Sequence, residues 1–157
     1  MKKETRLYNV MFPIWFFWLF PTLLWLIILP ANFAVDSLVL YLAMRRYALE
    51  NKAKIWKQSI WKIWAIGFLS DIAGALLIFG LYELLAEVFQ IGGSLMFFPG
   101  TTLLSMPGAA LAGVLIYFLN KRFAFKKCGL EPAQVHKLSL ALAIFTAPYA
   151  MLIPIYG

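Results

Sequence analysis

The sequence predicts an all-α integral membrane protein, folded as a single transmembrane domain over residues 1–157. Its composition is 63% hydrophobic and 13% charged, whereas an ordinary soluble domain carries about 25% charged residues. Apolar windows long enough to cross the hydrocarbon core, roughly 20 residues each, recur five times along the chain. We therefore expect a five-transmembrane-helix bundle.

The predicted spans are separated by short stretches that contain charged residues, glycine or proline. They cover approximately residues 7–29, 33–47, 61–82, 101–119 and 137–155. The first follows a basic segment, as the apolar core of a signal peptide does, but it is longer than the usual length of about 7–15 residues and contains Pro13 and Pro21. We expect it to be retained as a transmembrane helix, kinked at Pro21.

The junction between the first two predicted spans is the tripeptide Pro30-Ala31-Asn32. Proline ends a helix because it lacks a backbone N–H, and asparagine is a favoured N-cap, so we expect a short turn here. From Arg45 to Lys62 the chain is basic and rich in tryptophan. The later part of this stretch is expected to lie along the membrane surface before the third span begins.

Proline also punctuates the C-terminal half. Pro107-Gly108 falls inside the fourth span and is expected to kink it, which releases backbone carbonyls of the kind that coordinate ions in transporters. Glu131-Pro132 is expected to start the last helix, since proline is tolerated in the first turn. Pro148 is expected to break that helix.

The basic residues predict the orientation. The chain has 14 Lys and Arg against 7 Asp and Glu, and these basic residues lie between the apolar windows, where they set topology and do not indicate nucleic-acid binding. With the N-terminus inside and the C-terminus outside, five crossings place all 14 on the cytoplasmic side. We therefore expect a multi-pass protein of a bacterial cytoplasmic membrane. Its expected partner is the lipid bilayer, and we do not expect it to bind nucleic acid.

Two aspartates fall inside predicted spans, where a charged side chain is costly and usually functional. Asp71 lies nine residues after Lys62, which corresponds to about half the hydrocarbon thickness. Asp36 lies nine residues before Arg45 but only four after Asn32 of the predicted turn. Counting from the two membrane surfaces therefore gives two different depths for Asp36.

The two depths predict different sites. At the deeper position, Asp36 and Asp71 face each other with no intramembrane Lys or Arg to pair with, so the pair must hold a proton or a cation. At the shallower position, Asp36 joins Glu83 and Glu87 in an acidic outer vestibule that concentrates cations. Alternatively, each aspartate is structural and hydrogen-bonds a nearby polar group. The candidates are Ser37, Ser70, Asn32 and backbone carbonyls released by proline.

Small residues form two stripes at helical spacing, which allow another helix to approach closely. The first stripe lies in the third span and the second in the fourth. They consist of Gly67, Ser70 and Gly74, and of Ser105, Ala109 and Gly113. Because five short helices enclose little space alone, we expect these stripes to support helix packing in a homo-oligomer or with another membrane protein.

The motifs give no support to an enzyme. One cysteine, Cys128, permits no intrachain disulfide and no cysteine-based metal cluster. Asp71 follows Phe68-Leu69-Ser70 and not the Gly-x-Gly of aspartyl intramembrane proteases. A phosphate-binding glycine loop and a His-x-x-x-His pair are also missing from the sequence. We expect neither catalysis nor a cofactor, and the sequence identifies no metal.

The intramembrane carboxylates favour a small transporter or channel-like protein with a proton or cation site at Asp71 and Asp36. Two alternatives remain open. One is a non-catalytic accessory, assembly or sensor subunit that docks a partner through the second small-residue stripe. The other is a lipid-handling membrane protein, suggested by the aromatic first span and the basic interface.

Overall fold

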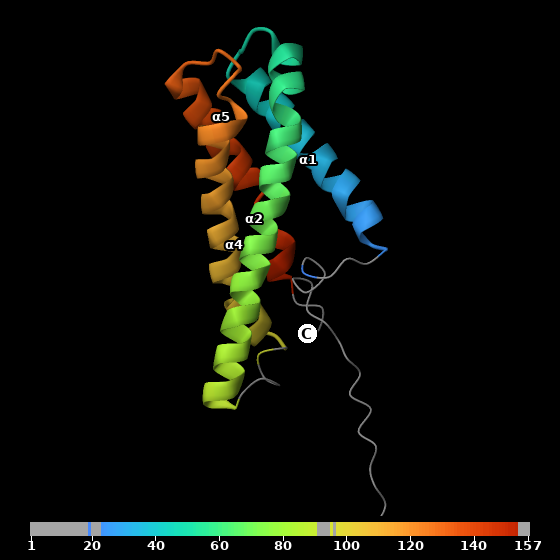
Figure 1. Ribbon diagram of the computed structural model, residues 1–157, viewed down its shortest axis with the longest axis vertical. Helices are drawn as coiled ribbons and strands as arrows, with labels where there is room; N and C mark the ends of the chain where they lie inside the picture. The colour runs from blue at the N-terminus through green and yellow to red at the C-terminus, as the bar shows by residue number, and fades with distance from the viewer. Residues whose placement is uncertain (1–18, 20–22, 91–94, 96, 154–157) are drawn as a thin grey trace, which may run out of the picture.

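The computed structural model describes residues 19, 23–90, 95 and 97–153, and within them the chain is helical (Figure 1). The elements are α1 (Trp25–Arg46), α2 (Lys52–Phe89), α4 (Gly100–Leu119), the π-helix η2 (Asn120–Ala124), α5 (Pro132–Phe145) and the 3-10 helix η3 (Tyr149–Leu152). Four stretches are long and apolar enough to cross a membrane, namely α1, α2, α4 with η2, and α5 with η3. The predicted span 7–29 lies mostly outside the described residues.

Helix α1 shows that the predicted turn at residues 30–32 is wrong. The helix begins at Trp25 and continues to Arg46 with Pro30 inside it, so the second span starts eight residues earlier than predicted. A proline within a helix removes one backbone hydrogen bond, and this loss is tolerated in membrane helices when neighbouring groups compensate. Asn32 is therefore an interior helical residue and not an N-cap.

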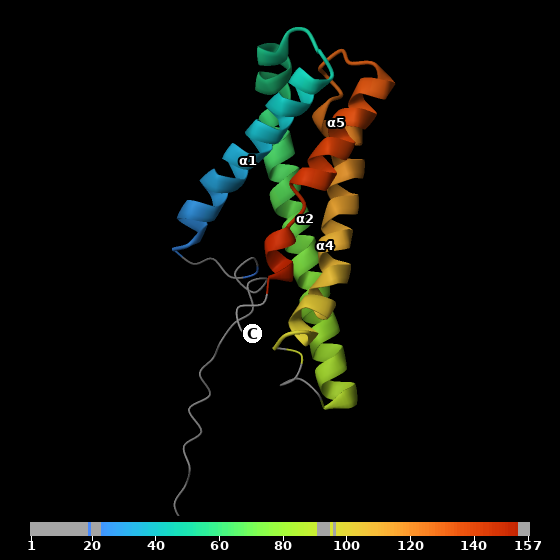
Figure 2. The same ribbon diagram turned by 180° about the vertical axis from the view of Figure 1, so that it is seen from behind.

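Aromatic side chains attach the first turns of α1 to α2. The two helices diverge towards Trp25 (Figures 1 and 2), and large rings span the distance between them. The Trp25 and Phe68 rings meet edge to face at 5.1 Å, and Phe33 contacts the Trp64 ring at 6.4 Å. Trp64 Nε1 also donates a hydrogen bond to the carbonyl of Leu29 at 3.1 Å. This packing explains why the chain stays helical through the proline.

Helix α2 is a single helix of 38 residues, so the predicted surface segment before the third span is also wrong. Its first turns point along the bundle because they carry core residues: Ile55 is 4% exposed and Ile60 is fully buried. The buried side chains follow one face of the helix as far as Ile78, about two turns beyond its middle. They are Ile55, Ser59, Ile60, Ile63, Gly67, Ser70, Asp71, Gly74, Ala75 and Ile78.

Helices α2 and α4 form the most extensive contact of the bundle. Their backbones touch at two glycines: a Cβ built on Gly74 would lie 2.6 Å from the carbonyl oxygen of Gly108, and one on Gly108 would lie 2.6 Å from that of Gly74. Such close approach of two helices is possible only where side chains are absent. The predicted fourth span, 101–119, agrees with α4 to within one residue, and α4 continues through Pro107.

The last predicted span, 137–155, lies in the right part of the chain but has the wrong bounds. Helix α5 begins at Pro132, where Glu131 and Gln134 form the reciprocal hydrogen bonds of a capping box. This confirms the predicted start at Glu131-Pro132. The helix ends at Phe145, before Pro148, and η3 follows as a separate short helix.

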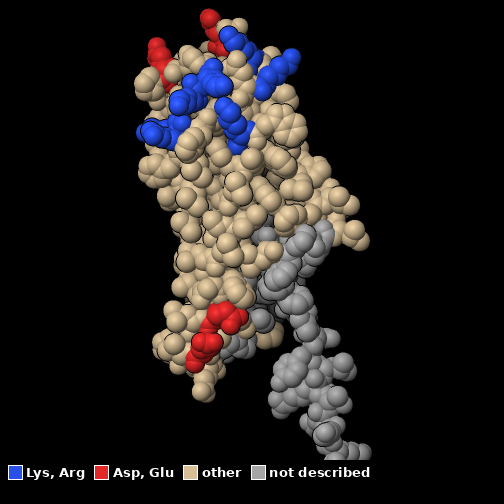
Figure 3. Space-filling model, in the orientation of Figure 1, with Lys and Arg blue, Asp and Glu red and all other residues tan. Residues whose placement is uncertain are grey.

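Charged residues are segregated along the long axis of the molecule. Helices α1 and α4 end, and α2 and α5 begin, at the same end of the bundle (Figure 2). The described Lys and Arg residues gather at this end, together with Glu50 and Glu131 (Figure 3). Glu83 and Glu87 lie on the last turns of α2, at the opposite end.

Candidate functional site

Two buried carboxylates from two helices lie at the same level of the bundle. Asp36 is near the middle of α1 and Asp71 near the middle of α2, and each is only 4% exposed. Asp36 precedes Arg45 by nine residues and Asp71 follows Lys62 by nine, which places each about 13 Å of helical rise from a basic residue of its own helix. Because the two helices run in opposite directions, these equal offsets bring the side chains together.

Both carboxylates line one small cavity with a volume of about 30 Å³. Helices α1 and α2 supply most of its wall, and the residue that follows α5 completes it. The lining residues are Asn32, Val35, Asp36, Gly67, Phe68, Asp71 and Thr146. A cavity of this size has room for a water molecule or a single monatomic ion and for little more.

Gly67 provides the space that the Asp36 carboxylate occupies. It lies one helical turn before Asp71, on the same face of α2. A Cβ built on Gly67 would lie 3.4 Å from Asp36 Oδ2 and 4.0 Å from Oδ1. A methyl group here would touch the carboxylate at an ordinary contact distance and take up part of the cavity, and a larger side chain would displace the carboxylate.

The carboxylates are incompletely hydrogen-bonded. Among the described residues, Asp71 Oδ1 is buried and has no hydrogen-bond partner. Asp36 shares the cavity lining with Thr146, whose hydroxyl donates to the carbonyl of Leu142 at 2.8 Å. The Thr146 oxygen thus keeps its acceptor capacity for a protonated carboxyl or a cation. A buried, unpartnered carboxylate oxygen indicates that a proton, water or ion belongs in the cavity.

No hydrogen bond joins either aspartate to Ser37, Ser70 or Asn32, the side chains that the sequence suggested as partners, in the described part of the chain. The Ser70 hydroxyl donates to the carbonyl of Ile66 at 2.7 Å, and the Ser37 hydroxyl is buried without a partner in the described part of the chain. Asn32 does line the cavity. Thr146 is the polar lining residue that sequence reasoning missed, and no local sequence pattern would have suggested it.

The cavity contains no positive protein charge, since none of its lining residues is basic. The two carboxyl groups line the same small cavity, and two like charges away from water repel strongly. At least one proton or cation must therefore accompany the pair. Within the residues described, no cluster of three or more His, Cys, Asp or Glu side chains is placed to hold a metal ion. The side-chain atoms of the cavity that could ligate a cation are all hard oxygens; the Asn32 amide nitrogen is the one other polar side-chain atom in the lining.

The predicted outer vestibule does not include Asp36. Of the two depths that the sequence allowed, the structure has the deeper one, beside Asp71 and Gly67. Glu83 and Glu87 are exposed on the far turns of α2, at least 12 residues and about 18 Å of helical rise beyond Asp71. They form no part of the cavity.

The two small-residue stripes have different neighbours. Gly74 packs on α4 at Gly108, within the stretch that carries the second stripe. Ser105 is fully buried and donates to a carbonyl one turn earlier in α4 at 2.7 Å. Ala109 and Gly113 instead line an apolar groove of about 620 Å³ between α4 and α5.

Comparison with known proteins identifies no relative of this chain. No protein-family model matches it, and neither a curated protein nor a solved structure does. A functional assignment therefore rests on the chemistry of the site.

Proposed function

We propose that the protein binds a proton or one small cation between Asp36 and Asp71 and uses this site to transport ions across the membrane. One observation carries the proposal: two carboxylates, each 4% exposed, share a cavity of about 30 Å³ that no basic side chain lines. Intramembrane acids are costly and rare outside ion and proton pathways. A purely structural pair would be expected to satisfy its buried oxygens, whereas Asp71 Oδ1 has no partner among the described residues.

The size of the cavity supports a proton or an alkali cation as the ligand. An organic cation is too large for a space of about 30 Å³. Mg²⁺ usually keeps several of its waters in an octahedral shell, for which the cavity has no room. Protonation of a carboxyl and binding of a cation are competing ways to neutralise the pair. Such competition would let the site exchange protons for cations.

We propose the five-crossing topology, with the N-terminus inside a bacterial cytoplasm and the C-terminus outside. Four described helical stretches are long and apolar enough to cross a membrane, and a fifth crossing would have to end before Trp25 and not at residue 29. The gathering of described Lys and Arg at one end supports assigning that end to the cytoplasm. Fluorescent-protein fusions at each terminus test this, because such a fusion fluoresces only in the cytoplasm. Fluorescence of the N-terminal fusion alone supports five crossings with the N-terminus inside. Fluorescence of both fusions, or of neither, refutes five crossings.

Ion binding is tested by the stability of the purified protein in detergent at increasing Na⁺, Li⁺ or K⁺ and at several pH values. A ligand that binds only the folded state raises stability with the logarithm of its concentration. We expect one alkali cation to stabilise the wild type, to do so more at higher pH, and to have no effect on Asp71→Asn. Glu83→Gln is the matched control, because it removes an exposed carboxylate from the same helix. An equal response of both variants would refute the site.

Transport is tested separately in proteoliposomes. We expect Asp36→Asn and Asp71→Asn to abolish flux of the stabilising cation driven by a proton gradient, whereas Glu83→Gln retains it. Flux that survives both aspartate substitutions would exclude the proposed mechanism. If a cation binds at Asp71 but is not transported, the proposed binding site stands and the proposed transport function is refuted.

A second candidate function, docking to another membrane protein or to a second copy, is favoured by the groove between α4 and α5. Its volume is about 620 Å³ and its lining includes Ala109 and Gly113. Such a groove can accept a helix from a partner. An accessory role predicts that Gly113→Leu abolishes co-purification of the partner while Asp71→Asn leaves it intact. The ion-site proposal predicts that Asp71→Asn abolishes cation-dependent stability and Gly113→Leu does not.

A further inference from the structure

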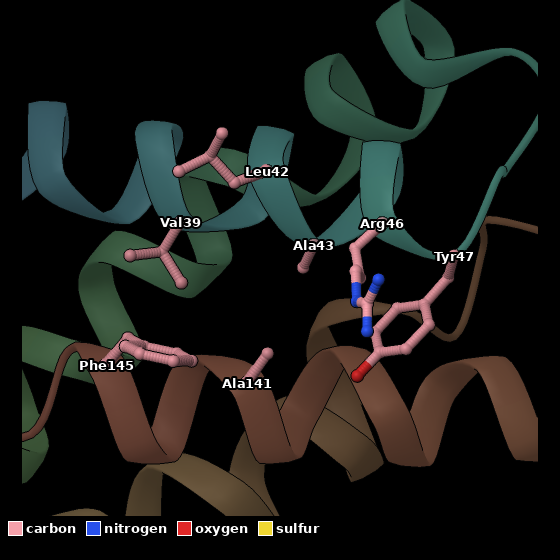
Figure 4. A pocket seen from close by; sticks show the side chains of 7 residues that line it. All are labelled: Val39, Leu42, Ala43, Arg46, Tyr47, Ala141 and Phe145. Atoms are coloured by element: carbon pink, nitrogen blue, oxygen red, sulfur yellow. The ribbon is translucent and has the colours of Figure 1, made fainter.

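Another hollow, distinct from the carboxylate cavity and from the groove between α4 and α5, lies between α1 and α5 (Figure 4). It has a volume of about 340 Å³ and shares no lining residue with the carboxylate cavity. Five of its seven lining residues are apolar, and the small side chains of Ala43 and Ala141 leave room between the two helices. Val39 and Phe145 form its inner end (Figure 4). We call it the α1–α5 groove.

The polar residues of the α1–α5 groove all lie at its other end. The Arg46 guanidinium and the Tyr47 phenol lie side by side there and point from α1 towards α5 (Figure 4). Lys137 of α5 adds a second positive charge, with Nζ 5.4 Å from the centroid of the Tyr47 ring. None of the lining residues is acidic. The mouth therefore presents the Arg46 guanidinium and the Tyr47 hydroxyl, with Lys137 beside the Tyr47 ring, at the basic end of the bundle.

The dimensions of the groove decide between a chain and a helix as its occupant. Arg46 follows Val39 by seven residues, so the groove extends about 10 Å along α1. A stretch of acyl chain of this length fits a groove of about 340 Å³, whereas an α-helix with side chains is about 10–12 Å across and would have to lie mostly outside it.

We propose that the α1–α5 groove binds one anionic phospholipid from the leaflet at the basic end. The phosphate lies between Arg46 and Lys137, where the Tyr47 hydroxyl can also donate, and one acyl chain follows the apolar walls towards Phe145. A guanidinium matches phosphate oxygens with two parallel donors, and basic pockets between transmembrane helices are suited to anionic headgroups. This inference does not depend on the ion site.

The test is native mass spectrometry of the full-length protein, purified in detergent and mixed with equal amounts of phosphatidylglycerol and phosphatidylcholine. We expect the wild type to retain phosphatidylglycerol preferentially. Arg46→Gln should lower that retention at least about fivefold. Arg45→Gln is the matched control, because it removes the same charge from the neighbouring position without touching the groove. It should change retention by less than about twofold.

Two further variants complete the test. Lys137→Gln removes a positive charge from the opposite helix and should also lower retention of phosphatidylglycerol. Agreement with Arg46→Gln would show that the loss does not come from misfolding of one variant. Ala141→Leu fills the groove without changing charge and should lower retention of the lipid as well. Equal losses in Arg45→Gln and Arg46→Gln would overturn the proposal in favour of general attraction to the basic surface. A protein dimer that Ala141→Leu dissociates would assign the groove to a second copy and also overturn it.

Discussion

Replacing Gly74 by alanine should force apart the two helices that form the largest internal contact. The new Cβ would lie 2.6 Å from the carbonyl oxygen of Gly108, 3.2 Å from its carbonyl carbon and 3.3 Å from the Ala112 Cβ. Ordinary contact distances begin at 3.4 Å, so α4 would have to retreat by roughly 0.8 Å at this point. The nearest atoms belong to backbone and cannot rotate away.

The magnitude follows from two opposing effects. Overpacking costs about 1–3 kcal/mol, and the upper part of that range applies because rigid backbone must move. Alanine is a better helix former than glycine by up to about 1 kcal/mol. The net expectation for Gly74→Ala is a loss of about 1–2 kcal/mol in the free energy of unfolding. Gly80→Ala is the matched control on the same helix, because no atom lies within 4 Å of its built Cβ.

The assay is unfolding in mixed detergent micelles by increasing SDS, followed by tryptophan fluorescence, since α2 contains Trp56, Trp61 and Trp64. Gly74→Ala should unfold at a lower SDS fraction than the wild type, while Gly80→Ala should unfold at the same or a higher fraction. Coincident transitions for the two variants would refute the close contact between α2 and α4.

Two further predictions concern the outer parts of the bundle. Trp64→Phe removes the hydrogen bond to the Leu29 carbonyl and should lower the free energy of unfolding by about 0.5–1.5 kcal/mol, measured by the same SDS titration. Trp61→Phe is the control, because this position is 66% exposed, and it should lower that free energy by less. Burial raises the pKa of the Cys128 thiol, against an opposing effect of Lys62. Less thiolate forms at neutral pH, so maleimide labelling should be slower than for a free thiol, should rise with pH, and should be slower still in Lys62→Gln.

Each of these two predictions has a clear contrary outcome. Equal destabilisation by the two tryptophan variants would mean that ring packing, and not the hydrogen bond, secures the start of α1. A labelling rate at neutral pH equal to that of an unfolded control would mean that the thiol is not shielded by its neighbours.

The sequence predicted the fold where local information decides the outcome. The described residues confirm an all-helical chain with helices long and apolar enough to cross a membrane, the position of α4 and the start of α5 at Glu131-Pro132. These features depend on the length of an apolar run or on local capping, which a chain carries in its own residues. The same information placed Asp36 and Asp71 at equal distances from basic residues, and the structure brings both to one cavity.

The failures have a common physical cause, which is packing between distant segments. Pro30 was expected to end a helix, but contacts of Trp25 and Trp64 with partners more than 30 residues away hold that helix together. The shallow depth considered for Asp36 followed from the same misplaced turn. Thr146 lines the cavity because α5 ends beside α1 and α2. No local sequence pattern predicts this contact between distant segments.

The three glycines of α2 allow the fold and the ion site to be tested independently. Alanine at Gly74 meets backbone at 2.6 Å, and alanine at Gly80 meets nothing within 4 Å. At Gly67 the built Cβ lies 3.4 Å from Asp36 Oδ2, an ordinary contact that the fold can accept. The added methyl group would nevertheless occupy part of a cavity of only about 30 Å³.

We therefore expect Gly67→Ala to unfold at nearly the wild-type SDS fraction in the absence of alkali cations, yet to lose the stabilisation that the bound cation gives the wild type. Gly74→Ala should show the reverse, a lower stability at every cation concentration with the cation-dependent increment retained. If Gly67→Ala loses stability without cations as Gly74→Ala does, the space beside Asp36 is a packing contact. If it keeps the full increment, the cation binds elsewhere, because a ligand held between Asp36 and Asp71 cannot share the cavity with that methyl group.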